Sequence, residues 1–145
     1  YYEAITKNRY VNRTFIMNTQ EKRKLNVKRK LNIVKQFIDN KNILIIDDSI
    51  VRGNTIKHII NLLKKNNVKK LYVASSCPEI KYENKYGIDI PNREELISYN
   101  KNIEEIEKKL RIDKLFFQKI SDLKKSIQIF NDKLTTFEMS ILDDL

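Results

Sequence analysis

Hydrophobic residues along this chain follow two different periods, and their alternation predicts the secondary structure. Short, β-branched apolar runs at residues 43–46 and 70–75 have the length and composition of buried strands. Between them, residues 54–65 place apolar side chains on one face of a helix, namely Ile56, Ile59, Ile60 and Leu63. The order strand, helix, strand predicts a parallel β-α-β unit within an α/β fold.

The rest of the chain carries a weaker pattern. Residues 10–17 form a strand-like or loop segment, and a basic stretch follows it through residue 32. Downstream we expect two short helices at 93–99 and 102–110, a strand at 114–118, an amphipathic helix at 120–130 and a short strand at 137–139. His58 lies opposite the apolar face of the first helix, so we expect it to be exposed.

Polar side chains follow the first strand directly. Asp47 and Asp48 lie at its carboxyl end, the edge at which parallel α/β sheets bind ligands. The loop after them leads into the predicted helix, whose free backbone N–H groups favour a phosphate. Gly53 permits a left-handed turn, Ser49 and Thr55 add hydroxyl donors, and Thr55 is a candidate helix cap. Because carboxylates only accept hydrogen bonds, the acid pair suits ribose hydroxyls and a divalent cation, which predicts a sugar-phosphate site.

This segment resembles the loop that binds phosphoribosyl diphosphate (PRPP) in type I phosphoribosyltransferases. The stretch Asp47–Gly53 is close to letter-for-letter that of the amidophosphoribosyltransferase family, which catalyses the first step of purine synthesis. Two more blocks agree in the right order, Lys7–Ile16 upstream and Tyr86–Pro91 downstream. Three ordered blocks make a chance resemblance improbable, and they cover roughly residues 5–140.

The resemblance implies a set of site residues. Lys7, Tyr10 and Arg13 match catalytic positions of a loop that closes over PRPP, supplies cations to the departing diphosphate and helps to form an ammonia channel. Asp47 and Asp48 would hold the ribose hydroxyls and position Mg²⁺. The implied PRPP-binding residues are Asp47, Asp48, Ser49, Ile50, Val51, Arg52, Gly53, Asn54 and Thr55.

The sequence leaves the roles of some site positions open. Arg52 is either a phosphate ligand or a surface arginine that points away from a loop lined by backbone groups. Asn54 stands where the family usually has threonine, so an amide replaces a hydroxyl beside the phosphate. Asn12 replaces a usual glycine in the upstream loop, which would stiffen its hinge.

The resemblance also implies a domain plan. We expect one partial phosphoribosyltransferase domain over residues 1–145, a three-layer, mainly parallel sheet that is incomplete at its N-terminal side. Its expected parts are a flexible loop region at 1–35, a PRPP-binding β-α-β unit at 41–78 and C-terminal helices and strands at 79–145. We expect the family's glutaminase domain to be absent from residues 1–145 and present in the full-length protein, because its nucleophile is an N-terminal cysteine and residue 1 here is tyrosine. The isolated chain is therefore expected to be inactive with glutamine, while the full-length protein is expected to be a homo-oligomer that also binds purine nucleotides.

Composition limits the partners. The net charge is +10, with basic residues concentrated between Lys22 and Lys35, which fits a solvated face, an anion-attracting loop or a nucleic-acid patch. No aromatic residues interleave there, so nucleic acid is disfavoured. The single cysteine, Cys77, excludes a four-cysteine iron–sulfur cluster within the chain and is expected to be a small buried residue at a strand end. Without a membrane-length apolar run or a signal-peptide pattern, a soluble, cytoplasmic protein is expected.

Two alternatives remain. A salvage-type or orotate-type phosphoribosyltransferase would share the acid pair and the loop but not the Lys7–Ile16 block. A PRPP-sensing regulatory protein, or one that binds nucleic acid, would keep the phosphate loop without catalysis, and only the basic stretch supports it.

Overall fold

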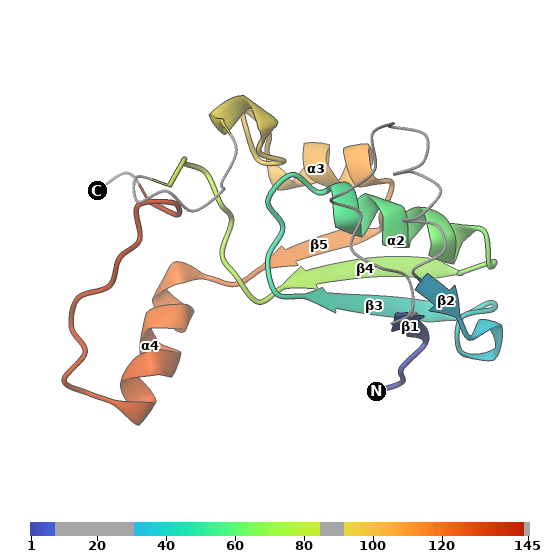
Figure 1. Ribbon diagram of the computed structural model, residues 1–145, viewed down its shortest axis with the longest axis horizontal. Coiled ribbons are helices and arrows are strands. Elements are labelled where there is room, and N and C mark those ends of the chain that lie inside the picture. The colour runs from blue at the N-terminus through green and yellow to red at the C-terminus, as the bar shows by residue number, and fades with distance from the viewer. Residues whose placement is uncertain (8–30, 85–91, 144–145) are drawn as a thin grey trace, which may run out of the picture.

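A parallel three-stranded sheet forms the centre of the molecule. The computed structural model describes residues 1–7, 31–84 and 92–143, and it is drawn in Figure 1. The strands β3 (Asn42–Asp47), β4 (Lys70–Ser75) and β5 (Lys114–Phe117) lie in the order β3-β4-β5 and are all parallel. Asp47 pairs with Ser75, and Ser75 pairs with Phe117, so the carboxyl ends of the three strands meet at one edge. The predicted parallel α/β fold is confirmed.

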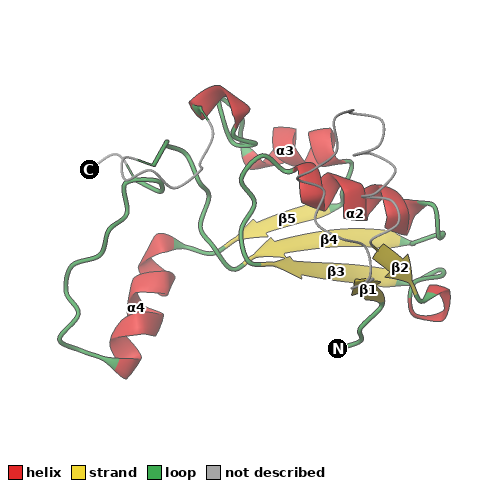
Figure 2. Cartoon of the chain, in the orientation of Figure 1, coloured by secondary structure: helices red, strands yellow, loops and turns green. Residues whose placement is uncertain are grey.

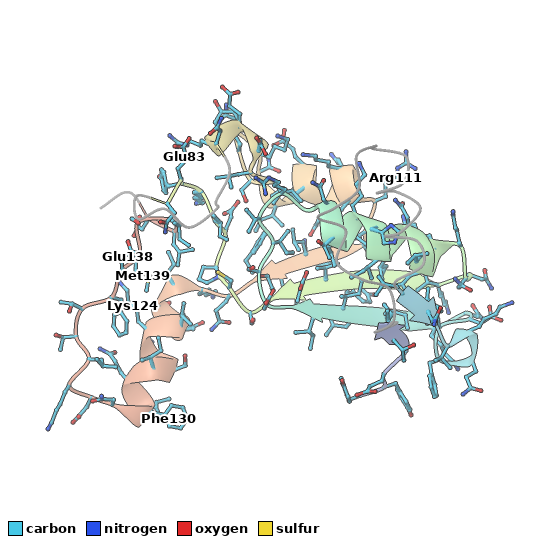
Figure 3. All side chains as sticks on the ribbon, viewed as in Figure 1. Glu83, Arg111, Lys124, Phe130, Glu138 and Met139 are labelled. Carbon is cyan, nitrogen blue, oxygen red and sulfur yellow. The ribbon has the colours of Figure 1, made fainter. Side chains whose placement is uncertain are left out.

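Helices α2 (Asn54–Lys64) and α3 (Ile103–Leu110) cover one face of this sheet (Figure 1). Their buried side chains and those of β4 and β5 form the main core: Ile56, Ile60, Leu63, Leu71, Val73, Ile106, Leu110 and Leu115. The Lys64 ammonium of α2 donates to the backbone carbonyl of Arg111, the residue that caps the end of α3 and is labelled in Figure 3. The predicted β-α-β unit therefore packs as its amphipathic pattern indicates.

A second, smaller cluster lies beyond the carboxyl edge of the sheet. It consists of Ile80, Leu96, Met139 and Leu142, and Cys77 packs against it. Helix α4 (Ile120–Phe130) follows β5 on this side, and Figure 3 places Phe130 at its far end, where it is 90% exposed. The expected strand at 137–139 is wrong: Phe137 and Met139 instead pack into the cluster from an irregular segment, with no neighbouring strand in the described residues. A stretch of three residues, Phe137-Glu138-Met139, is too short for its apolar-polar-apolar pattern to distinguish a strand from such a segment.

Two further expectations need correction. The helix expected at 93–99 is only a 3₁₀ turn, η3 (Arg93–Glu95), because the backbone becomes extended at Leu96, with ψ 140°. Leu96 then enters the second cluster while Ile97 enters the main core, because successive side chains of an extended segment point to opposite sides. His58 is half-buried, with its Nε2 covered, rather than exposed.

Near the N-terminus the structure adds a hairpin-like pair that the pattern did not predict. Strand β1 (Ile5–Lys7) pairs antiparallel with β2 (Leu31–Ile33), and Ile5 and Ile33 pack against the main core. A 3₁₀ turn, η2 (Lys35–Phe37), connects this pair toward β3. These strands have only three residues each, too few to establish a period.

Among the described residues, no helix covers the second face of the sheet. Along β3, Ile43 and Ile45 face the main core, while Leu44 and Ile46 are 54% and 73% exposed. Phe116 of β5 is 50% exposed, and Ala74 of β4 lies between it and Ile46 in the register. In the cartoon of Figure 2, α2 and α3 lie on the other side of the strands. The described residues thus contain two of the three expected layers.

None of the helices in the described ranges combines the length and the hydropathy that crossing a bilayer requires.

Candidate functional site

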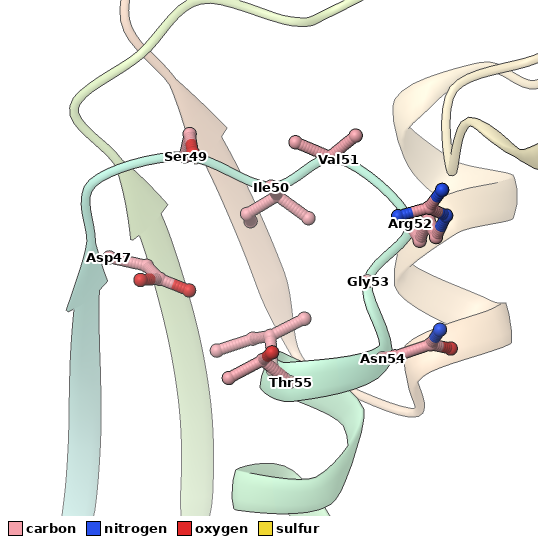
Figure 4. A pocket seen from close by; sticks show the side chains of 9 residues that line it. Asp47, Ser49, Ile50, Val51, Arg52, Gly53, Asn54 and Thr55 are labelled. Atoms are coloured by element: carbon pink, nitrogen blue, oxygen red, sulfur yellow. The ribbon is translucent and has the colours of Figure 1, made fainter. Parts of the chain in front are cut away.

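The loop between β3 and α2 encloses a cavity at the carboxyl edge of the sheet, as Figure 4 shows from close by. We call Ser49–Thr55 the phosphate loop, after the role that the sequence predicts for it. The cavity has a volume of about 310 Å³ and is lined by Asp47, Ser49, Ile50, Val51, Arg52, Gly53, Asn54, Thr55 and Ile56. Eight of the nine residues that the sequence assigns to PRPP therefore line one cavity, and Asp48 is the exception.

Gly53 makes the turn into the helix possible. It is the residue that caps α2 and adopts φ +76°, a left-handed conformation that costs other residues about 1–2 kcal/mol. Its carbonyl accepts the first helical hydrogen bond, from Lys57 N at 2.9 Å. Since no side chain caps this helix, the expectation that Thr55 is the cap is wrong. The N–H groups of the first helical turn are left available at the cavity, where they favour an anion.

The two carboxylates at the end of β3 have different surroundings. Asp47 is half-buried and its Oδ1 accepts a hydrogen bond from Asp48 N at 3.1 Å. Asp48 is exposed, and its Oδ1 accepts from Ser49 N at 2.7 Å. Burial, with a further contribution from the charge of Asp48, raises the pKa of Asp47 above its ordinary value of 3.8. Asp47 is thus a desolvated carboxylate at the cavity, and a cation or a hydroxyl donor there would stabilise its charged form.

The backbone after β4 holds the acid pair in place. Ser76 N donates to the Asp47 carbonyl at 3.0 Å, and Cys77 N donates to the Asp48 carbonyl at 2.9 Å. The Ser76 hydroxyl also donates to the Asp48 carbonyl at 3.2 Å. Sequence reasoning missed Ser76, because its role comes from the parallel pairing of β3 with β4. Cys77, which was expected to be buried, is half-buried beyond the end of β4, and burial together with the charge of Asp48 raises the pKa of its thiol.

The side chains of the phosphate loop point to two sides. In Figure 4, Asp47 lies on the strand side of the cavity, while Arg52 and Asn54 point toward α3. Arg52 Nε donates to Glu95 Oε2 at 2.8 Å. A second hollow, of about 270 Å³, lies on that outer side and is lined by Arg52, Gly53, Asn54, Lys57, Glu95, Ile97, Lys109 and Leu110. The residues that bind the outer side of the loop, Glu95 and Ile97, carry no signal in the sequence pattern.

The acid pair meets the chemical requirements of a magnesium site in part. Among the described residues no group of three or more His, Cys, Asp or Glu side chains gathers into a closed cation site. Mg²⁺ in phosphate-binding sites ordinarily takes one or two carboxylates and completes its shell with water and phosphate oxygens. The Asp47 carboxylate at the cavity fits this need, and Asp48 adds a second hard oxygen donor beside it.

The catalytic residues expected upstream are only partly placed. Lys7 is the last residue of β1, opposite Leu31 in the register. Tyr10 and Arg13 lie outside the described residues, as do the block Tyr86–Pro91 and most of the basic stretch.

A parallel sheet with a carboxylate pair at its edge, followed by a phosphate loop at a helix N-terminus, defines a phosphoribosyltransferase-type domain. Sequence comparison identifies the family. Over 141 residues the chain is 46% identical to the amidophosphoribosyltransferase of Haemophilus influenzae, and over 143 residues it is 42% identical to that of Escherichia coli. These matches cover 97% and 99% of this chain and 28% of each relative.

A solved structure gives the same result. Glutamine PRPP amidotransferase from B. subtilis, complexed with ADP and GMP, superposes with a TM-score of 0.74 and 36% identity over 92% of this chain and 29% of that chain. No family model matches. The chain belongs to the amidophosphoribosyltransferase family and spans less than a third of the length of the relatives that it matches.

Proposed function

We propose that this chain supplies the PRPP-binding part of an amidophosphoribosyltransferase. The parent reaction converts PRPP, glutamine and water into 5-phosphoribosylamine, glutamate and diphosphate. The observation that carries the proposal is the cavity of about 310 Å³, with the Asp47 carboxylate on its strand side and a helix N-terminus on the other. A sugar phosphate needs this pair of features, an acceptor for its hydroxyls and a donor array for its phosphate.

The phosphate loop would bind the 5′-phosphate mainly through backbone N–H groups at the start of α2. Asp47 would accept hydrogen bonds from the ribose hydroxyls. When diphosphate leaves C1, positive charge develops on the ribose ring, and a fixed carboxylate nearby stabilises that charge. Asp47 and Asp48 would hold Mg²⁺, which supplies charge neutralisation to the leaving diphosphate when it is bound.

Three upstream residues complete the proposed chemistry. Lys7, Tyr10 and Arg13 would close over PRPP and offer positive charge to the departing diphosphate. Ammonia would come from a glutaminase part outside residues 1–145, so the isolated chain is proposed to be inactive with glutamine. Assembly into a homo-oligomer, a cytoplasmic location and regulation by purine nucleotides belong to the same proposal. The complex of the B. subtilis relative with ADP and GMP supports the nucleotide ligands.

The alternatives differ in support. A salvage-type or orotate-type enzyme would also bind PRPP, but the relatives reported above are all amidophosphoribosyltransferases. A non-catalytic PRPP sensor would use the same cavity, and only an assay of the complete enzyme separates it from the proposed function.

Calorimetric titration of the chain with PRPP and Mg²⁺ tests the proposal. The variant with both Asp47→Asn and Asp48→Asn is expected to lose roughly tenfold to a hundredfold in affinity, because hydrogen bonds to charged groups contribute about 1.5–3 kcal/mol. The matched control is Asp132→Asn, which removes one carboxylate from the exposed segment after α4 and should bind as the parent chain does. Equal affinity in the double variant would refute the site.

A further inference from the structure

The outer side of the phosphate loop is held at three consecutive residues by a segment far along the chain. We call Glu95–Ile97 the brace. Ile97 N donates to the Val51 carbonyl at 2.9 Å, and Glu95 Oε2 accepts from Arg52 Nε at 2.8 Å. At Gly53 the Ile97 side chain fills the space where a Cβ would stand, so an added methyl group would overlap Ile97 Cδ1. A backbone hydrogen bond, an ion pair and an apolar contact thus fix three neighbouring positions of the loop.

The brace is anchored on both hydrophobic clusters. Ile97 is 1% exposed and belongs to the main core, whereas the adjacent Leu96, also 1% exposed, belongs to the second cluster. The phosphate loop repeats this arrangement, since Ile50 lies in the main core and Val51 packs against the second cluster. Both segments therefore sit across the junction of the two clusters, which makes the brace a rigid support for the loop.

The ion pair has a different character from the apolar contacts. The side chains of Arg52 and Glu95 are 38% and 54% exposed. Exposed ion pairs contribute little to global stability, because water and salt screen them. Their geometric effect is local: the Arg52 guanidinium is directed to the outer side of the loop, toward α3, as Figure 4 shows. Binding by backbone N–H groups depends on a preorganised loop, since reordering the loop on binding would cost affinity.

We propose that Glu95 is a positioning residue for phosphate binding, which acts by holding Arg52 on the outer side of the phosphate loop. Arg52 is then a structural partner of Glu95 rather than a ligand of the phosphate. This inference rests on the proposed function, in that PRPP is the ligand whose phosphate the loop receives. It assigns the loop geometry to a residue that does not line the cavity.

The first test compares two neighbouring glutamates. Glu95→Gln removes the charge that holds Arg52, while Glu94→Gln makes the same change in the same 3₁₀ turn, at an exposed residue with no described contact to the loop. In calorimetry with PRPP and Mg²⁺, Glu95→Gln is expected to weaken affinity by roughly twofold to fivefold. Glu94→Gln should bind as the parent chain does, and both variants should keep its thermal midpoint. Unchanged affinity in Glu95→Gln would overturn the proposal.

A charge swap separates positioning from ligand binding by Arg52. Arg52→Glu alone should weaken PRPP binding, and combining it with Glu95→Arg should restore most of the affinity, because the ion pair reforms in reverse. If Arg52 contacts the phosphate itself, the double variant would stay as weak as Arg52→Glu, and the proposed role would be wrong.

Hydrogen exchange gives a readout without PRPP. Loss of the ion pair is expected to speed exchange of the amides of residues 49–54 in Glu95→Gln and to leave those of Glu94→Gln unchanged. Equal exchange in the two variants would contradict positioning by Glu95, whatever the chain binds. Failure of the parent chain to bind PRPP, in contrast, would refute the proposed function and leave the exchange result to decide on the brace.

Discussion

At the scale of single residues, Asp47 and Gly53 each carry a feature that is unfavourable for folding: a partly buried charge and a left-handed backbone conformation. Asp47 is an ionisable group that burial disfavours, and Asp48 beside it adds a repulsive charge. Gly53 adopts a left-handed backbone conformation that residues with a Cβ rarely adopt. An added Cβ would also overlap the side chain of Ile97. Neither the buried charge of Asp47 nor the left-handed backbone of Gly53 is a feature that favours folding by itself.

Asp47→Asn is expected to stabilise the ligand-free chain at neutral pH. Because the pKa of Asp47 is raised above 3.8 in the folded state, the folded chain binds this proton more tightly than the unfolded chain does. The native carboxylate therefore lowers stability once the pH rises through the raised pKa, and asparagine removes that penalty. Thermal unfolding across pH should show a higher midpoint for Asp47→Asn at neutral pH, and the difference should shrink as the pH falls through the raised pKa and vanish below the ordinary value of 3.8.

The control for this experiment is Asp132→Asn, which removes the same charge from an exposed segment. It should not reproduce the gain. A lower midpoint for Asp47→Asn at neutral pH would contradict the desolvation of Asp47.

At the scale of elements, amphipathic spacing predicted α2 well, because Ile56, Ile60 and Leu63 face the main core as their positions require. Helix α3 has instead a strong local start signal. The Asn102 Oδ1 accepts from Glu105 N at 2.9 Å, and Glu105 Oε2 accepts from Asn102 N at 2.8 Å, which completes a capping box. The segment 93–99, where a helix was expected, lacks such a cap. The packing of Leu96 and Ile97 into two different clusters accompanies its extended backbone instead.

Asn102→Ala is expected to destabilise the chain by about 1 kcal/mol, because it leaves an N–H at the start of α3 without its side-chain acceptor. Asn92→Ala is the matched control, since Asn92 precedes η3 without making a side-chain cap. Urea unfolding followed by circular dichroism measures both. Equal losses in the two variants would show that the capping box contributes nothing specific.

At the scale of the whole molecule, the open sheet face is the main liability of the isolated chain. Leu44, Ile46 and Phe116 are at least half exposed on this face. Ala74 of β4 pairs with Ile46 on one side and with Phe116 on the other, so these apolar residues are neighbours. Contiguous exposed apolar surface of this kind favours association, which lowers the area in contact with water. The formal charge of +10 opposes association by repulsion between copies, and salt screens that repulsion.

We therefore expect the isolated chain to self-associate as the salt concentration rises. Replacing Ile46 and Phe116 by threonine should shift the species seen in sedimentation velocity toward monomer, with little change in the unfolding midpoint, because both side chains are already exposed. The matched control is Ile129→Thr with Phe130→Thr, which removes exposed apolar groups from the end of α4. The same shift in the control pair would mean that the sheet face has no special role.

The sequence by itself determined what depends on neighbouring residues: the strands β3 and β4, helix α2 with its apolar face, the left-handed turn at Gly53 and the acid pair at the strand end. Local spacing carries these features, since strand and helix periods are set by a few consecutive residues. The tertiary structure decided the rest. Leu96 and Ile97 pack into two different clusters and so hold the brace against the phosphate loop. Glu95, 43 positions along the chain from Arg52, pairs with the Arg52 side chain on the outer side of the loop. Contacts so far apart in the chain depend on how elements pack, and no local pattern encodes them.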